Sequence, residues 1–319
     1  MRVLREILTR ATHLVGVLLF VSAVTFSLTN LLPGTMAEAM LGEQASKEDL
    51  ARLERQMGLD RPLPERFGKW LLSAAQGDLG RSFATSERIG PAIAHRLPVS
   101  VELVILSQLM ALALAVPLGV LAGYREGKAV DRLLSSGAFA TLALPHFVSG
   151  IILIYIFAIQ LRWLPATGFQ PLSEGLAQNL RSMLLPSLTL ALVEAPAYLR
   201  IIRSDLATTL REDFVMVARA KGLPNWRILL THALRPSSLG LVTVMGINVG
   251  HLIGGAIVIE TLFALPGLGS MLMESISRRD YVAVQGVVLV VSVGFVAVNV
   301  VVDLLYVVLD PRTRHHARR

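Results

Sequence analysis

The 319-residue sequence contains no cysteine, and only 17% of its residues are charged. The lack of cysteine excludes a disulfide framework, a cysteine-based zinc or iron–sulfur site and a thiol nucleophile. With 53% hydrophobic residues, the chain also lacks the polar residues that would cover the surface of a soluble globular domain. We therefore expect an integral membrane protein.

Motifs for nucleotide binding and for hydrolysis are missing as well. The Gly127-Lys128 pair lacks the Gly-rich turn and the hydroxyl residue of a phosphate loop, so the chain is not expected to hold ATP in that way. No HExxH metal-binding pair occurs, and His315-His316 lies in a polar tail, where a solvated pair is the simpler interpretation. No Gly-x-Ser-x-Gly nucleophile elbow is present. We expect no catalysis, no cofactor and no metal ion in this chain.

Long segments with few or no charges predict six transmembrane helices, since about 20 apolar residues cross a bilayer core. These segments are 14–32, 103–124, 133–161, 182–199, 236–259 and 281–309. A cleavable signal peptide is the alternative for the first segment. Its uncharged stretch of 19 residues is longer than the usual 7 to 15, and no clear small-x-small cleavage site follows. The expected fold is therefore all-α, with a retained first helix.

The distribution of charge predicts the orientation of these helices. Net charges of +2, +1, +4 and +3 occur in segments 1–13, 124–132, 200–235 and 310–319, and net charges of 0, +1 and 0 occur in segments 33–98, 162–181 and 263–281. An excess of Lys and Arg in short loops is typical of the cytoplasmic face. Both termini are therefore expected in the cytoplasm. Topology explains the basic composition, so we expect no nucleic-acid partner.

Three parts of the chain are expected. Residues 1–98 would form the first helix and an extracytoplasmic loop domain, residues 99–310 a five-helix membrane domain, and residues 311–319 a basic cytoplasmic tail. The loop at 33–98 has nine acidic and nine basic residues, which is typical of a small domain outside the membrane.

One stretch at 211–236, REDFVMVARAKGLPNWRILLTHALRP, is basic and amphipathic within an apolar chain. Leu206, Leu210, Phe214 and Val217 recur at steps of four, four and three, which predicts one face of a helix of about four turns. The alternative is an ordinary surface helix pair with a solvated basic face.

This helix is expected to stop at Gly222, which follows Lys221 at the place of a left-handed C-cap residue. Pro224 suits the first turn of a second helix, which is expected to run over 225–234 and to end at Pro236. The stretch therefore predicts a helix, a sharp turn and a second helix.

The run ARAKG at 218–222, ten residues before HALRP at 232–236, resembles the cytoplasmic loop of permease subunits in binding-protein-dependent ABC importers of the dipeptide, oligopeptide and nickel group. The general family pattern is Glu-Ala-Ala, three residues, Gly, nine residues, Ile-x-Leu-Pro. Only Ala218, Gly222 and Leu234 match it, and the peptide group departs from the pattern in the same way.

Further landmarks of this group are spread along the chain. They include PGTMAEAMLG at 33–42, MGLDRPLPERFGKWLLSAAQGDLGRSF at 57–83, ETLFALPGLGSMLMESISRRDYVAVQG at 260–286 and VVDLLYVVLDPRTR at 301–314. The resemblance therefore covers nearly the whole sequence.

The resemblance implies the transmembrane domain of a type I ABC importer in the bacterial inner membrane, without catalytic activity. The implied partners are a homologous second permease subunit, two ATPase domains that bind ATP and Mg, and an extracytoplasmic solute-binding protein. The cargo stays open among dipeptides, longer peptides, glutathione and nickel chelates. A coupling helix would dock on the ATPase through Phe214, Ala218, Arg219, Ala220, Lys221, Gly222 and Leu223.

Polar residues inside the predicted spans are candidates for lining the transport pathway, because each is costly if it faces lipid. They are Glu194, Asn248, His251 and Asn299. Hydrogen bonding between helices is the alternative role, and Gly250, Gly254 and Gly255 are expected to allow close helix packing. An ion-coupled secondary transporter or channel is the alternative function, but it should show inverted repeats, and we find none.

Overall fold

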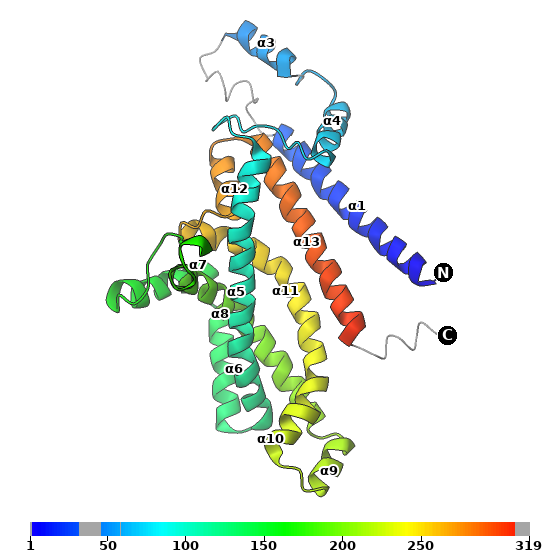
Figure 1. Cartoon of the computed structure of the whole chain (residues 1–319), viewed down its shortest axis with the longest axis vertical. Coiled ribbons are helices and arrows are strands. Elements are labelled where there is room, and N and C mark those ends of the chain that lie inside the picture. The colour runs from blue at the N-terminus through cyan, green and yellow to red at the C-terminus, as the bar shows by residue number, and fades with distance from the viewer. Residues whose placement is uncertain (1, 32–45, 58, 310–319) are drawn as a thin grey trace. The chain divides into compact units, whose positions relative to one another are not determined.

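The computed structural model describes residues 2–31, 46–57 and 59–309. Throughout these ranges the regular structure is helical, apart from one isolated bridge between Arg81 and Arg88. The expected landmark at 33–42 and the expected basic tail at 311–319 lie outside the described residues. Internal contacts divide the chain into two compact units, Met1–Ser100 with Pro266–Val296, and Val101–Leu265 with Ala297–Arg319. The helices are labelled in Figure 1.

The first unit combines helices from both ends of the sequence. They are α1 (Arg2–Leu31), α3 (Lys47–Met57), α4 (Leu63–Ala75), the first turns of α5 (Ile89–Tyr124), α12 (Leu268–Ser277) and the first half of α13 (Tyr281–Leu309). Phe26 of α1 packs against Phe67 and Trp70 of α4, with ring centroids 5.5 and 5.8 Å apart. A buried core joins α5, α12, α13 and the loop before α5 through Leu79, Ile89, Ile93, Leu268, Met271, Ala283 and Val287.

The second unit is built around α8 (Leu176–Thr209), whose neighbours include α6 (Ala129–Leu142), α7 (His146–Leu153) and α11 (Leu234–Leu262). In its most apolar stretch, 72% of the residues of α8 are buried, compared with 28% in α5 and 22% in α11. α8 is therefore the central helix of this unit. The π-helix η1 (Ile154–Gln160) and a short 3-10 turn, η2 (Leu172–Glu174), connect α7 to α8.

Four helices in the described part of the chain are long and apolar enough to cross a membrane: α5, α8, α11 over Pro236–Leu262 and α13 over Tyr281–Val302. A fifth results if the two helices on either side of a sharp bend, Ala129–Leu142 and His146–Gln160, are taken as one span. Within α1, the apolar segment Val15–Thr29 is shorter than these spans. The structure confirms the all-α membrane fold but does not confirm the count of six.

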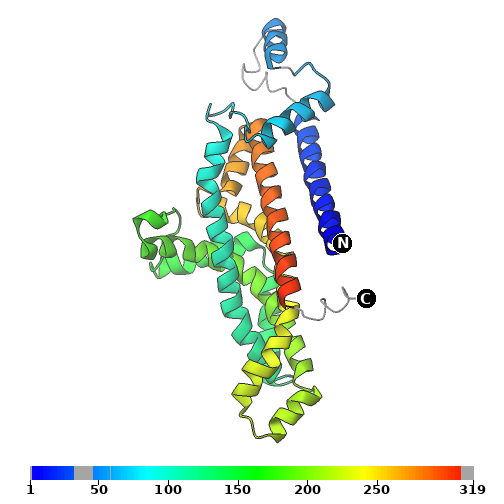
Figure 2. The ribbon, with the colours of Figure 1, turned by 45° about the vertical axis from the view of Figure 1, so that its right-hand side comes forward.

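The prediction of one continuous helix over 133–161 is wrong. The chain bends by 104° between α6 and α7, and Figures 1 and 2 both show the segment after α6 turning away from the α6 axis. Pro145 precedes α7 with φ −59° and ψ 144°. Its ring disfavours helical backbone at Leu144, the residue before it. The search for uncharged segments did not reveal the break, because no Asp, Glu, Lys or Arg lies near it on either side.

α5 and α8 approach each other closely at Gly119 and Gly123. A Cβ atom at Gly119 would lie 3.0 Å from the carbonyl oxygen of Leu199, and one at Gly123 would lie 2.9 Å from that of Arg203. Small residues four positions apart let two helical backbones touch in this way. The expected packing role of Gly254 is wrong, because a Cβ atom there would meet nothing within 4 Å.

The helix that starts at Asn225 does not end at Pro236, so this prediction is also wrong. α10 (Asn225–Arg227) continues through the π-helix η3 (Ile228–Ala233) into α11. Proline removes one N–H donor and crowds the carbonyl group four residues earlier, here that of His232. His232 lies in the wider π-helical turn, which provides room for the ring within a continuous helical path.

Candidate functional site

The predicted helix with Leu206 and Phe214 on one face is wrong. α8 ends at Thr209, and α9 (Asp213–Ala220) begins after Glu212, whose ψ of 149° is extended. Negative charge stabilises the start of a helix, so the consecutive acidic residues Glu212 and Asp213 favour a new helix here. As a result Leu206 is buried in the second unit, whereas Phe214 is 46% exposed.

α9 packs on the segment that follows it through a small apolar cluster. Val215 and Ala218 of α9 are buried with Ile228 of η3, and Leu223 packs against them. α9, α10 and η3 therefore form a helical hairpin of residues 213–233, called the α9–η3 hairpin here. Figure 1 shows α9 and α10 at one end of the second unit.

The turn of the hairpin is made by Gly222, whose φ is +74°. Its N–H donates to the carbonyl oxygen of Arg219 at 2.9 Å, and the N–H of Leu223 donates to that of Ala218 at 3.3 Å. These two bonds form a Schellman motif, and Leu223 supplies the hydrophobic contact that accompanies it. The prediction of a left-handed glycine C-cap is confirmed.

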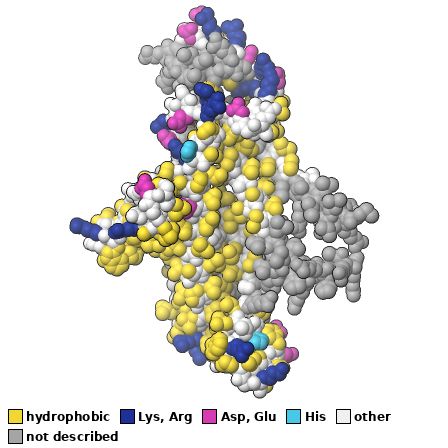
Figure 3. Space-filling view, viewed as in Figure 1, with side chains coloured by type: hydrophobic (Ala, Val, Ile, Leu, Met, Phe, Trp, Pro, Cys, Tyr) yellow, Lys and Arg dark blue, Asp and Glu magenta, His cyan; other side chains and the backbone are white. Residues whose placement is uncertain are grey.

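The outer surface of the hairpin is both apolar and basic. Five large apolar side chains are between 46% and 65% exposed: Phe214, Met216, Val217, Trp226 and Leu230. Three basic residues are exposed on the same hairpin: Arg219, Lys221 and Arg227. Figure 3 shows hydrophobic and basic side chains mixed at this end of the unit. Such a surface is typical of a protein–protein contact.

Not every residue predicted to dock lies on this surface. Ala218 is buried in the apolar cluster, and Leu223 is half-buried beside it, so both shape the hairpin from inside. Four of the exposed apolar residues on this surface were not among those predicted to dock: Met216, Val217, Trp226 and Leu230. Trp226 could have been noticed as a large aromatic residue in a loop that is otherwise rich in charge.

Ion pairs hold the α5–α6 loop against α8 and the start of the hairpin. Asp131 is buried and accepts hydrogen bonds from Nε and Nη2 of Arg203, the latter at 2.7 Å, and from the N–H of Gly127 at 2.9 Å. Arg211, just before α9, pairs with Glu126 of the same loop. One pair therefore ties the loop to α8, and the other ties it to the segment just before the hairpin.

The structure brings two of the four predicted pathway residues together. The carboxyl of Glu194, which is buried in α8, faces the side chains of Asn248 and Tyr198. Tyr198 in turn donates a hydrogen bond to Oε1 of Gln108 at 3.0 Å. This polar cluster joins α5, α8 and α11, which favours hydrogen bonding between helices as the role of Glu194. The other two residues lie elsewhere, one exposed on α11 and one half-buried on α13: His251 and Asn299.

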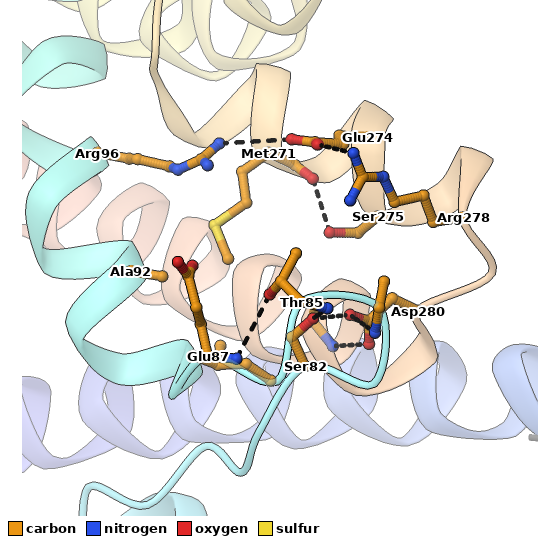
Figure 4. A pocket seen from close by; sticks show the side chains of 13 residues that line it. Ser82, Thr85, Glu87, Ala92, Arg96, Met271, Glu274, Ser275, Arg278 and Asp280 are labelled. Carbon is orange, nitrogen blue, oxygen red and sulfur yellow. Dashed lines mark hydrogen bonds and ion pairs between the residues drawn. The ribbon is translucent and has the colours of Figure 1, made fainter. Parts of the chain in front are cut away.

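A second polar site lies in the first unit, where the loop before α5 meets the corner between α12 and α13 (Figure 4). Asp280 at this corner is buried and accepts hydrogen bonds from Oγ of Ser82 and from the N–H of Ala283 at 3.2 Å. Glu274 pairs with Arg278 at 2.8 Å. Segments 198 residues apart in the sequence are thus fastened together.

Comparison with known families and proteins finds relatives along nearly the whole chain. Residues 115–315 match the family described as binding-protein-dependent transport system inner membrane component, and residues 3–104 match its N-terminal region. A Brucella abortus protein named as a peptide transport system permease is 38% identical over 309 residues, which are 97% of this chain and 98% of the relative. The glutathione transport system permease protein GsiC of Salmonella paratyphi A is 35% identical over 312 residues, 98% of this chain and 99% of the relative.

A solved chain of the inward-facing MetNI methionine ABC transporter has a similar fold. Its TM-score is 0.56 at 16% sequence identity, and the match covers 69% of this chain and 96% of that chain. At this identity the likeness shows the fold alone, which is that of a type I ABC importer permease. The family match and the two relatives go further: the chain belongs to the inner membrane components of binding-protein-dependent transport systems.

Proposed function

We propose that the chain is the permease subunit of an ABC importer that carries peptides across the bacterial inner membrane. The names of its relatives, which refer to peptide and glutathione transport, support this cargo class. The chain itself would hydrolyse no ATP. A second permease subunit would complete the pathway, two ATPase domains would bind ATP and Mg, and an extracytoplasmic binding protein would deliver the peptide. The test is to measure which ligands that binding protein binds. If none of them is a peptide, the proposed cargo is wrong.

One observation carries the mechanistic part of the proposal, namely the apolar and basic outer surface of the α9–η3 hairpin. A surface with exposed aromatic side chains and arginines is suited to dock into a groove on another protein. The hairpin is also rigid, because the Schellman turn and the apolar cluster hold its two halves together. Closure of the ATPase pair would therefore move the hairpin as one body and shift α8 and α11, which precede and follow it in the chain.

Loss of the two exposed aromatic residues tests this docking surface. Trp226→Ser and Phe214→Ser should each weaken binding of the ATPase subunit about tenfold or more, because interface aromatics carry much of the binding energy. Leu72→Ser on α4 is the matched control, since Leu72 is 63% exposed and lies in the other unit. Affinity is measured with purified permease and ATPase subunits.

The turn provides a second, independent variant. Gly222→Val should reduce both ATPase binding and uptake, because a side chain at φ +74° adds strain of about 1 kcal/mol or more and displaces the hairpin. Gly168→Val introduces the same kind of strain at φ +97°, away from the hairpin, and should leave binding unchanged. If the aromatic variants and Gly222→Val all keep full binding and full uptake, the coupling role is wrong.

The proposed orientation has support from contacts within each unit. Two segments predicted outside, 33–98 and 263–281, are joined by the Ser82–Asp280 hydrogen bond. Two segments predicted in the cytoplasm, 124–132 and 200–235, are joined by two ion pairs. These contacts support the proposal that each pair of segments lies on one face of the membrane, as the charge distribution predicts.

Cysteine labelling tests which face is which, and the absence of native cysteine means that the chain itself gives no background labelling. Ser46→Cys should react with a membrane-impermeant maleimide on intact cells. Ser204→Cys, at an exposed position near the end of α8, should react only after the membrane is permeabilised. The opposite pattern at the two positions would reverse the proposed orientation.

A further inference from the structure

A pocket of about 310 Å³ lies between α6 and α8 in the second unit. Its walls are mostly apolar and include Phe139, Leu142 and Leu199, while Arg200 and Arg203 line it as well. Phe139 and Leu142 are 59% and 45% exposed, so the wall formed by α6 is open to the surroundings of the helix. In a membrane protein these surroundings are lipid, unless another subunit covers them.

The pocket has a charged end and an apolar end. α6 and α8 run in opposite directions here, because Asp131 at the start of α6 pairs with Arg203 near the end of α8. The two arginines therefore lie toward the charged α5–α6 loop, and Leu142 lies toward the middle of the apolar segment. This is the polarity of a phospholipid, with a charged head and an apolar tail.

The charged end holds one positive charge that no side chain in the described part of the chain neutralises. Arg203 directs Nε and Nη2 at Asp131, which balances its charge. Arg200 is exposed and forms neither an ion pair nor a hydrogen bond with any residue in the described ranges. An arginine at the edge of an apolar segment is costly without a partner, and a phosphate group is the anion whose geometry suits its planar donors.

We propose that this pocket binds an anionic phospholipid, whose phosphate pairs with Arg200 and whose acyl chain lies along Phe139, Leu142 and Leu199. Charge complementarity selects an anionic over a zwitterionic lipid. Such lipids are enriched in the cytoplasmic leaflet, where the proposed orientation places this end of α8. Binding itself depends only on the pocket, so it is testable apart from the proposed transport function.

Lipid binding is measured on the full chain in detergent by native mass spectrometry, with phosphatidylglycerol and phosphatidylcholine as probes. Phosphatidylglycerol should bind the unmodified chain more tightly than phosphatidylcholine. Arg200→Gln should lower its affinity about tenfold, the value of one charge-assisted contact. Arg132→Gln is the matched control, because Arg132 is exposed on α6 close to the same end but does not line the pocket. Leu142→Trp, which fills the apolar end, should also reduce binding.

Several results would overturn the proposal. Equal binding of the two lipids would show a generic apolar surface, and equal losses in Arg200→Gln and Arg132→Gln would show nonspecific charge attraction. Displacement of the lipid by inorganic phosphate alone would show a free anion site. In the assembled transporter, cross-linking of Phe139→Cys to the second permease would show that protein covers the pocket.

Discussion

Gly123→Val is expected to prevent accumulation of the folded chain in membranes. A Cβ atom at this position would lie 2.9 Å from the carbonyl oxygen of Arg203 and 3.2 Å from Cβ of Leu206. The first of these atoms is a backbone oxygen of the central helix α8, and the second is the first side-chain carbon of a residue in the same helix. Neither can move aside as the end of a flexible side chain would. Forcing α5 and α8 apart should cost about 3 kcal/mol or more, at the upper end of overpacking effects.

The measurement is the amount of monodisperse protein extracted from membranes, followed by size-exclusion chromatography. Gly254→Val on α11 is the matched control, because it makes the same chemical change in a helical glycine with nothing within 4 Å. Normal amounts of Gly123→Val protein, with an unchanged unfolding temperature, would contradict the close approach of α5 and α8.

Asp131→Ala is expected to lower stability by about 3 kcal/mol and to abolish uptake. Asp131 is 2% exposed and is the anchor of the α5–α6 loop, with hydrogen bonds from Arg203 and Gly127. Removing one member of a buried ion pair leaves the other without compensation, a loss of about 3–5 kcal/mol. The lower end of this range applies because the side chain of Arg203 remains 30% exposed to solvent.

Thermal unfolding of Asp131→Ala, Arg203→Ala and the double variant measures the coupling between the two residues. The double variant should be no less stable than Asp131→Ala alone. Glu65→Ala is the control, since Glu65 pairs with Arg61 and Lys69 on an exposed helix, where an ion pair contributes about 0–1 kcal/mol. Strictly additive losses would show that the Asp131–Arg203 pair does not hold the loop.

The sequence was informative where a local rule fixes the backbone. The positive φ of Gly222 follows from its place after a basic last turn and before Leu223-Pro224, and the structure has it at +74°. The apolar helices were also recognisable, since each segment must satisfy its own backbone in lipid. Both inferences use only neighbouring residues and the solvent around them.

Features that depend on partners far away in the sequence were missed. The steps between Leu206 and Phe214 fit one long helix equally well, and only the packing of α9 on Ile228 shows which apolar residues turn inward. Close packing occurs at Gly119 rather than at Gly254, because the rotation of each helix about its axis decides which glycine meets a neighbour. The periodicity of a sequence shows which residues share one face of a helix. It does not show which neighbouring element that face contacts.

The continuous helical path from Asn225 to Leu262 has the form of a lever with unequal arms. It meets α8 at Gly240, where a Cβ atom would strike the side chain of Asp205. At about 1.5 Å per residue, the arm toward Asn225 is about 22 Å long and the arm toward Leu262 about 33 Å. A tilt about this point therefore moves the far end roughly one and a half times as far as the near end, so a small push at one membrane face becomes a larger displacement at the other.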